Sequence, residues 1–339
     1  MTHLNISLFM LVAFFVLPVS ASAETLDAQT MAERGLSHAE DFPGLAGLCN
    51  MEDPIRDASK RHSGDSNREK GRSGANRRST PLAPARVFDN LYYVGTGGVA
   101  SWVIETSEGL IVIDALNNNA EAKKYLVGGL QTLGLDPNDM QYLIITHGHG
   151  DHYGGQDLLV SRYQPNVVMS DIEWTILEQP KLDFSSPRWG ERPERDVSIE
   201  DGDVITLGDT SVRLYVTPGH TPGTVSLIFP VYDEGERHMA ALWGGTGLNY
   251  GPVVSRIQSY SDAAERFRRK AEDAGVDVFL SNHPTRDGSA QRLKALKEHR
   301  EGQPHPFVIG EEMAQGAFEM LRDCTRAQVL RLKADAGSE

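Results

Sequence analysis

The sequence is poor in cysteine, in long apolar segments and in positive charge. Only Cys49 and Cys324 occur among 339 residues, and neither has the C-x-x-C spacing of a zinc ribbon or a redox site. No apolar run long enough to cross a bilayer follows residue 23, which argues against a polytopic membrane protein. Aspartate and glutamate number 47 against 33 lysines and arginines, and the net charge of −14 argues against nucleic acid or anionic lipid as a partner. We therefore expect a soluble, monomeric protein that acts on a small molecule.

The first 23 residues have the pattern of a secretory signal peptide. An apolar run from Ile6 to Val19 precedes Ala21-Ser22-Ala23, a small-x-small cleavage site. The segment before the run contains no lysine or arginine, so an uncleaved anchor helix is the alternative. Because the run is short for a membrane span, we expect cleavage and export to the periplasm or the medium. In an oxidising compartment the two cysteines can form a disulfide, or they can stay as buried thiols.

Composition divides the rest of the chain into three parts. Residues 24–59 form an N-terminal extension with partly helical patterns. Residues 60–84 are rich in serine, glycine, asparagine and arginine and have almost no apolar side chain, which predicts a solvated basic linker; an anion-binding arm is the alternative. Residues 85–335 contain alternating strand and helix patterns and predict a single catalytic domain.

The order of the predicted elements indicates the fold class. Short apolar runs between residues 85 and 114 are separated by turn residues, which predicts antiparallel hairpins; a helix over 119–133 and a strand over 142–146 follow. Two such blocks of strands, each followed by helices, predict an α/β protein with two packed mixed sheets and outer helices, an αββα sandwich. Further expected helices are 26–34, 42–51, 155–162, 171–178, 259–273, 289–300 and 311–333, and further expected strands are 166–169, 204–207, 211–216, 224–229, 239–243 and 276–280.

A long irregular loop is predicted over residues 180–197, which contain three prolines. Its Phe184, Ser185, Ser186 and Trp189 are suited to flank an active-site cleft, because functional side chains are concentrated on such loops. An ordinary surface loop is the alternative.

Five of the eleven histidines follow the ends of predicted strands. Three of them lie with one aspartate in the glycine-rich segment T-H-G-H-G-D-H-Y-G-G, a fourth lies in T-P-G-H-T-P-G, and a fifth precedes a proline. Imidazole and carboxylate are ligands that zinc accepts, so the pattern predicts two adjacent metal sites. The candidate ligands are His147, His149, Asp151, His152, His220 and His283.

These motifs resemble the metallo-β-lactamase superfamily over about residues 85–300, and subclass B3 most closely. The subclass is indicated because His283 is present and because no cysteine or aspartate follows strand 239–243, where most other hydrolases of the superfamily place a bridging aspartate. The resemblance implies two zinc ions per chain. One would be held by His147, His149 and His220, and the other by Asp151, His152 and His283.

The function that the resemblance implies is that of an exported dinuclear zinc hydrolase. A zinc-bound hydroxide would open the β-lactam amide, and Asp151 would orient it as well as bind metal. Asp114 matches a residue that supports the ligand loop, with a turn-forming aspartate as the alternative. The alternatives to a β-lactamase are a zinc hydrolase of lactones, thioesters or other esters, and a zinc-binding protein without catalysis.

One segment departs from the subclass. Subclass B3 enzymes carry serines just after the strand that matches 239–243, where they help to hold the substrate carboxylate, whereas this chain has Gly244-Gly245-Thr246-Gly247. Only Thr246 offers a hydroxyl there, and Asn249 or Tyr250 are the candidate substitutes. The difference leaves room for an enzyme whose main substrate is not a β-lactam.

Overall fold

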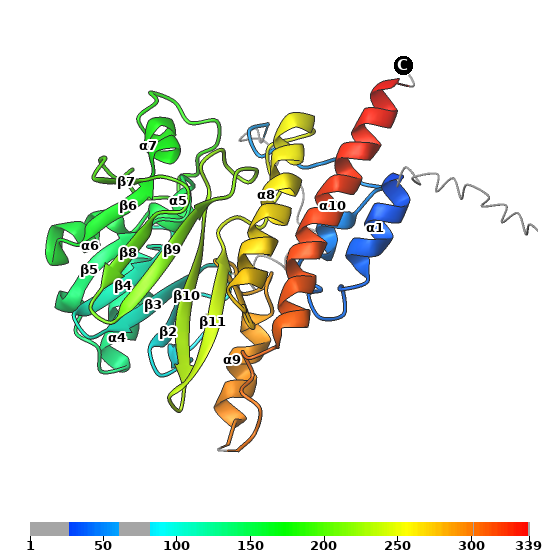
Figure 1. Cartoon of the computed structure of the whole chain (residues 1–339). Coiled ribbons are helices and arrows are strands. Elements are labelled where there is room, and N and C mark those ends of the chain that lie inside the picture. Colours follow the sequence, from blue (N-terminus) through cyan, green and yellow to red (C-terminus); the bar gives the residue numbers. More distant parts are fainter. Residues whose placement is uncertain (1–26, 61–81, 301, 338–339) are drawn as a thin grey trace, which may run out of the picture.

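The computed structural model describes residues 27–60, 82–300 and 302–337. The predicted signal peptide and most of the predicted linker lie outside these residues. Within the described part, two β-sheets pack face to face and helices cover both outer sides (Figure 1). The predicted α/β class and αββα sandwich are therefore confirmed.

The first sheet has its strands in the order in which they occur along the chain. They are β1 (Ala85–Arg86), β2 (Leu91–Gly95), β3 (Ala100–Thr106), β4 (Gly109–Ile113), β5 (Met140–Ile144), β6 (Asn166–Ser170) and β7 (Val197–Ile199). Strands β1 to β4 pair antiparallel, as the short turns between them require. Strands β4 to β7 pair parallel, because the longer connections between them return the chain each time to the end of the sheet at which the previous strand began.

The second sheet has the order β12-β11-β10-β9-β8. Its strands are β8 (Val204–Leu207), β9 (Thr210–Val216), β10 (Val225–Asp233), β11 (Glu236–Trp243) and β12 (Val278–Ser281). Three pairings are antiparallel, and β12 joins β11 in parallel. Strands β9, β11 and β12 therefore point the same way, and their carboxyl ends meet at one edge of the sandwich.

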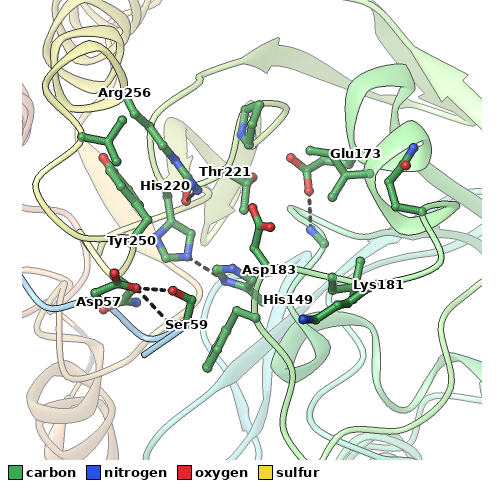
Figure 2. A pocket seen from close by; sticks show the side chains of 18 residues that line it. Asp57, Ser59, His149, Glu173, Lys181, Asp183, His220, Thr221, Tyr250 and Arg256 are labelled. Carbon is green, nitrogen blue, oxygen red and sulfur yellow. Dashed lines mark hydrogen bonds between the residues drawn. The ribbon is translucent and has the colours of Figure 1, made fainter. Parts of the chain in front are cut away.

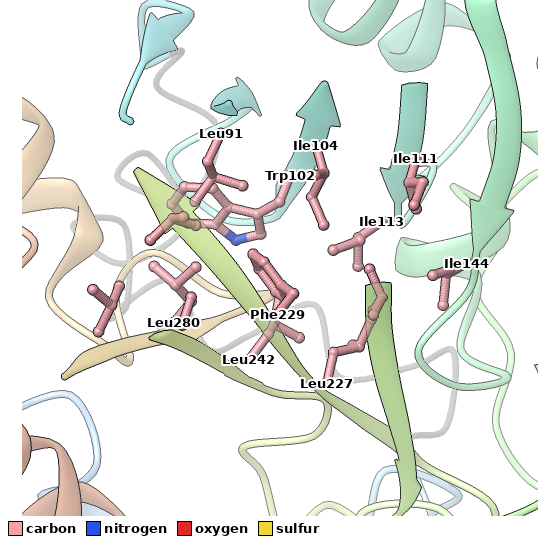
Figure 3. Packing of buried hydrophobic residues seen from close by; sticks show 14 of the residues in the cluster. Leu91, Trp102, Ile104, Ile111, Ile113, Ile144, Leu227, Phe229, Leu242 and Leu280 are labelled. Carbon is pink, nitrogen blue, oxygen red and sulfur yellow. The ribbon is translucent and has the colours of Figure 1, made fainter. Parts of the chain in front are cut away.

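The core between the sheets is built from alternating strand residues. Trp102 and Ile104 of β3 point toward Phe229 and Leu242 of the second sheet (Figure 3). Val103, between them in sequence, belongs instead to the cluster under the helices of the first sheet. Because successive side chains of a strand point to opposite faces, one apolar strand contributes both to the core between the sheets and to the cluster under the helices.

Helices on the outer face of the first sheet connect its parallel strands. The predicted helix 119–133 is present, but its middle forms a π-helix. Gly129 allows this helix to lie close to β2, because a Cβ atom at position 129 would come 2.7 Å from a methyl group of Val94. The helices of this layer are α3 (Asn119–Glu121), η3 (Ala122–Val127), α4 (Gly128–Thr132), α5 (Gly150–Tyr153), α6 (Gln156–Tyr163) and α7 (Asp171–Leu177), and the short η4 (Pro137–Asp139) precedes β5.

The outer face of the second sheet is covered by α1 (Ala28–Leu36), η1 (Ala46–Cys49), α8 (Val254–Asp273) and α10 (Glu311–Gly337) (Figure 1). The remaining helix, α9 (Ser289–Glu298), contributes Leu293 to the core between the sheets. Tyr260 and Phe267 of α8 pack with Phe318 of α10 and with Trp243 of β11. None of the helices in the described ranges combines the length and the apolar composition that a membrane span needs.

Three sequence predictions of local structure differ in part from the structure. The predicted loop is present over residues 180–196, but its last residue, Val197, begins a strand that was not predicted, β7, and pairs with Val168 of β6. This strand is too short to show a periodic pattern. Helix α8 begins earlier than predicted, at Val254, where no side chain caps the helix and marks its start. Most of the predicted helix 42–51 consists of turns, and only the single 3₁₀ turn η1 is helical.

Cys49 and Cys324 form a disulfide, which resolves the alternative that the sequence left open. The bond joins η1 to α10 across a sequence separation of 275 residues. Beside it, the side-chain amide of Gln328 donates to the carbonyl oxygens of Leu48 at 3.0 Å and Asn50 at 2.7 Å. The N-terminal extension is thus fixed to the last helix by both a covalent and a polar contact.

We expect loss of the disulfide to destabilise the whole fold. The double variant Cys49→Ser/Cys324→Ser should lower the free energy of unfolding by about 2–4 kcal/mol, because the unfolded chain gains freedom when a long loop is opened. Urea unfolding of both proteins, with and without reductant, measures the difference. Reductant should weaken the wild type and leave the variant unchanged; equal midpoints for wild type and variant without reductant would contradict the expectation.

Candidate metal centre

The candidate ligands gather at one edge of the sandwich, because each follows the carboxyl end of a strand. His147 and His149 come after β5 of the first sheet, whereas His220 follows β9 and His283 follows β12 of the second. Hydrogen bonds join the sheets at this edge. Among them, the backbone N–H of Val225 donates to the carbonyl oxygen of Thr146 at 2.8 Å, and the indole N–H of Trp102 donates to the carbonyl oxygen of Ser281 at 2.9 Å.

Three imidazoles converge on one point. Nε2 of His147 and Nδ1 of His149 each lie 3.1 Å from Nε2 of His220. The other ring nitrogen of His220 lies 2.6 Å from the carbonyl oxygen of Gly247, so it carries the proton and leaves Nε2 with a lone pair. Nitrogens bound to one zinc ion at about 2.0–2.1 Å lie about 3.3 Å apart in a tetrahedron, so the cluster fits a metal ion.

A second group lies beside the first and consists of Asp151, His152 and His283, with candidate ligand atoms within 4.8 Å of one another. Nδ1 of His283 lies 2.7 Å from the carbonyl oxygen of Gly98, which directs its Nε2 into the group. Nε2 of His152 is buried and has no hydrogen-bond partner among the described residues. A buried lone pair without a donor is costly, and a cation bound here would remove that cost.

The protonation states of four of the five imidazoles suit metal binding. Burial lowers the pKa of His149 and of His283 to about 4, and it lowers the pKa of His147 and His220 well below the usual range. These imidazoles are therefore neutral at pH 7, as ligands must be. For the fifth, His152, burial lowers the pKa, but the neighbouring carboxylates of Asp114 and Asp151 outweigh it and raise the pKa. Burial raises the pKa of Asp151, but interaction with His152 and His283 outweighs it, and the pKa falls to about 2.

Asp114 supports the loop that carries most of the ligands. It is fully buried at the end of β4, with a φ of 64° that aspartate tolerates better than most residues. Its carboxylate accepts hydrogen bonds from the backbone N–H of Thr146 at 2.8 Å and from the hydroxyl of Thr146 at 3.0 Å. It also lies 2.7 Å from Nδ1 of His152, which orients that ring toward Asp151 and His283.

A cavity of about 360 Å³ opens over both groups. Thr246 and Asn249 line it, and so do Phe184, Ser186 and Trp189 of the predicted loop, whereas Ser185 does not. The rings of His149 and Trp189 stack with centroids 6.0 Å apart, so the loop forms an aromatic wall beside the three-histidine group.

A second cavity of about 410 Å³ adjoins the first and shares His149 and His220 with it (Figure 2). Arg256 lies over the ring of Tyr250 at 3.7 Å and donates to the carbonyl oxygens of Gly219, at 2.9 Å, and His220. The sequence did not indicate this arginine, which holds the His220 loop in place. The hydroxyl of Tyr250 is buried and has no hydrogen-bond partner within the described ranges.

Glu173 was missed by the sequence analysis. It is fully buried, accepts a hydrogen bond from the N–H of Gly148 at 2.6 Å and another from the N–H of Gly223 at 2.7 Å, and thereby joins the two loops that supply the three histidines. Burial raises its pKa. Ser170 and Glu173 have the spacing of a helix capping box. This local pattern indicates only a helix start and gives no sign that Glu173 joins the two ligand loops.

Asn282, also missed, joins the sheets next to His283. Its side-chain N–H₂ donates to the hydroxyl of Thr146 at 3.0 Å and to the carbonyl oxygen of Gly244 at 2.7 Å. The loops after β5, β11 and β12 are therefore linked through one buried amide.

Comparisons with known sequences agree with this architecture. A family model described as the metallo-β-lactamase superfamily matches residues 94–233. A hydroxyacylglutathione hydrolase of Rhodopseudomonas palustris is 32% identical over 207 residues, which cover 57% of this chain and 72% of the relative. The protein of the same name from Chelativorans is 24% identical over 231 residues, 65% of this chain and 84% of the relative.

Solved structures with the same fold include subclass B3 enzymes. A subclass B3 metallo-β-lactamase of Bradyrhizobium japonicum superposes with a TM-score of 0.61 and 26% identity, covering 78% of this chain and 99% of that chain. A class B3 di-zinc metallo-β-lactamase from an Alaskan soil metagenome has a TM-score of 0.60 at 20% identity, covering 75% of this chain and 96% of its own.

We expect Glu173→Gln to weaken metal binding, because the new amide group cannot accept both backbone hydrogen bonds and the two ligand loops lose their common anchor. Removal of such supporting groups typically costs 10- to 100-fold in metal affinity. Competition with a chromophoric chelator measures the affinity. The exposed Glu200→Gln variant is the control with the same change in charge, and equal affinities of both variants would contradict the role assigned to Glu173.

Proposed function

The chain belongs to the metallo-β-lactamase superfamily, and within it we propose an exported hydrolase with two zinc ions that opens β-lactams. The observation that carries the proposal is the composition of the second ligand group. It takes His283 from the second sheet, and glycine, rather than aspartate or cysteine, follows Trp243 of β11. This ligand set is the one that the resemblance to subclass B3 implies, and the 26% identity to the enzyme of Bradyrhizobium japonicum supports it.

The donor set suits zinc. Five imidazoles and one carboxylate divided into two groups of three leave positions open for water and substrate, which is typical of catalytic rather than structural zinc sites. Bound zinc would supply a water molecule that is deprotonated near neutral pH and an electrophile for atoms that gain negative charge.

The residues around the site have distinct roles in the proposed reaction. The ionised carboxylate of Asp151 accepts a hydrogen bond from the attacking water and orients it toward the amide carbon. The nitrogen that leaves the opened ring develops negative charge on the side of His152 and His283. Phe184 and Trp189 exclude bulk water from one side of the cavity.

A second candidate function is the hydrolysis of thioesters or other esters. The hydroxyacylglutathione hydrolases that match this chain favour it, because a relative with that name is 32% identical over a wide range. The segment Gly244–Gly247, which offers only the hydroxyl of Thr246, also differs from the expected β-lactam contacts.

Export to the periplasm or the medium is part of the proposal. The disulfide between Cys49 and Cys324 supports it, since such bonds persist in oxidising compartments and are rare in the cytosol. The predicted signal peptide is consistent with the same compartment.

A substrate panel tests the proposal. Zinc-loaded protein should hydrolyse nitrocefin, a penicillin and a carbapenem faster than S-lactoylglutathione and simple lactones, and EDTA should abolish the activity until zinc is restored. Turnover of the thioester without any β-lactam would favour the second candidate. Zinc binding without turnover of any compound would identify a non-catalytic zinc-binding protein.

Two histidine variants should separate the metal sites. His283→Ala should retain close to one zinc ion, because Asp151 and His152 alone are too few for tight binding, and kcat for β-lactams should fall about 10²- to 10³-fold. His220→Ala should instead empty the three-histidine group. Metal analysis and kinetics measure both effects, with His299→Ala as the control outside the site. Full zinc content in either ligand variant would refute its assignment.

A further inference from the structure

The N-terminal strap, which we define as residues 42–60, forms part of the wall of the catalytic cavity. It runs antiparallel to the segment after β11: the N–H of Ala58 donates to the carbonyl oxygen of Asn249 at 2.7 Å, and the N–H of Gly251 donates to that of Arg56 at 2.9 Å. Figure 2 shows Asp57 and Ser59 of the strap beside Tyr250 and near His220. The strap therefore reaches the metal centre from the far end of the sequence.

The same strap also contacts the loop that carries His283. The guanidinium of Arg286 donates to the carbonyl oxygen of Gly44 at 2.7 Å. A Cβ at Gly44 would lie 2.0 Å from the carbonyl oxygen of Thr285, so only glycine permits this approach. The disulfide at Cys49 holds the middle of the strap on α10. Both ends are thus fixed next to the catalytic cavity.

These contacts place two arginines in the lining of the cavity over the metal ligands, Arg56 from the strap and Arg286 from the His283 loop. The cavity lining contains two carboxylates, Asp151 and Glu121. Asp151 belongs to the candidate metal ligands, and Glu121 accepts a hydrogen bond from Asn117 at 2.8 Å and lies 3.9 Å from the third arginine of the lining, Arg188. The strap side of this cavity is therefore cationic, in a protein with a net charge of −14, whereas the carboxylate of Asp57 lines the adjoining cavity and lies 3.4 Å from the ammonium of Lys60.

We propose that Arg56 and Arg286 bind a carboxylate of the substrate, an inference that rests on the proposed hydrolase function of the same site. A guanidinium matches a carboxylate with two parallel hydrogen bonds and keeps its charge at any physiological pH. The bond from Arg286 to Gly44 holds its side chain in place before substrate binds, which reduces the entropy lost on binding. The strap and the His283 loop together form the anion-binding side of the site.

The proposal narrows the class of substrate. Penicillins, cephalosporins and carbapenems carry a carboxylate next to the lactam nitrogen. S-acyl derivatives of glutathione carry carboxylates in the glutathione part, which leaves as the thiol. Simple lactones are neutral. The cavity therefore selects an anionic amide or thioester over a neutral ester of similar size.

A pair of thiols tests this anion recognition without turnover. The thiolate of 3-mercaptopropionic acid and that of its neutral analogue, 3-mercaptopropionamide, both bind zinc, and they differ in charge only at the other end. Calorimetry on the zinc-loaded full chain should give a tighter Kd for the acid by about tenfold or more. Arg56→Gln and Arg286→Gln should each reduce this preference, and the double variant should abolish it. Arg237→Gln, an exposed arginine of β11, is the control with the same loss of charge and should keep it.

Two further readouts separate this inference from a change in folding and from the proposed function. Zinc content and thermal unfolding identify the variants that fold. If Arg286→Gln does not fold, Arg286→Lys replaces it. A reduced preference for the acid over the amide is still expected, because lysine cannot form two parallel hydrogen bonds to a carboxylate. For a penicillin that the enzyme turns over, Arg56→Gln should raise KM about tenfold and change kcat little. For the methyl ester of the same penicillin, the substitution should leave KM unchanged.

Each outcome of these measurements decides one claim. If no substrate is turned over but the acid is still preferred, the proposed function fails and the anion site stands. If turnover occurs and the double variant still prefers the acid, the anion site is wrong. A chain that binds no zinc and neither thiol overturns both.

Discussion

The metal centre depends on the carboxylate of Asp114. Buried between the strands, it accepts two hydrogen bonds from Thr146 and lies against Nδ1 of His152, so one charged group fixes both the start of the ligand loop and the direction of a ring. A buried carboxylate is tolerated only when donors surround it, and here the donors are the residues that must be positioned. Without Asp114, the start of the loop after β5 and the ring of His152 would lose their common anchor.

A second layer of buried polar groups extends this arrangement across the sandwich. Glu173 joins the loops of His149 and His220, and Asn282 joins those after β5, β11 and β12. These groups hold neutral imidazoles with lone pairs that face one another, an arrangement that is unfavourable unless a cation lies between them. The fold therefore keeps the ligands in the geometry that binding requires and contributes this preorganisation to metal affinity.

The sequence predicted the sandwich, and the six candidate ligands that it named lie together in two groups, because both depend on local patterns. Apolar strands showed their period, and His147, His220 and His283 each stood at a strand end. Glu173, Asn282 and the strap could not be predicted in this way, since their partners lie far away in the chain and their local patterns indicate only a helix cap, a turn or an extension. Strand β7 and the disulfide were likewise decided by tertiary contacts rather than by periodicity.

The central claim is that two metal ions lie in two separate groups of three ligands. Anomalous diffraction at the zinc absorption edge, from crystals of the zinc-loaded protein, tests it most directly. The account predicts two peaks in each chain, one among His147, His149 and His220 and one among Asp151, His152 and His283. A single peak, or a second peak held by other residues, would contradict it.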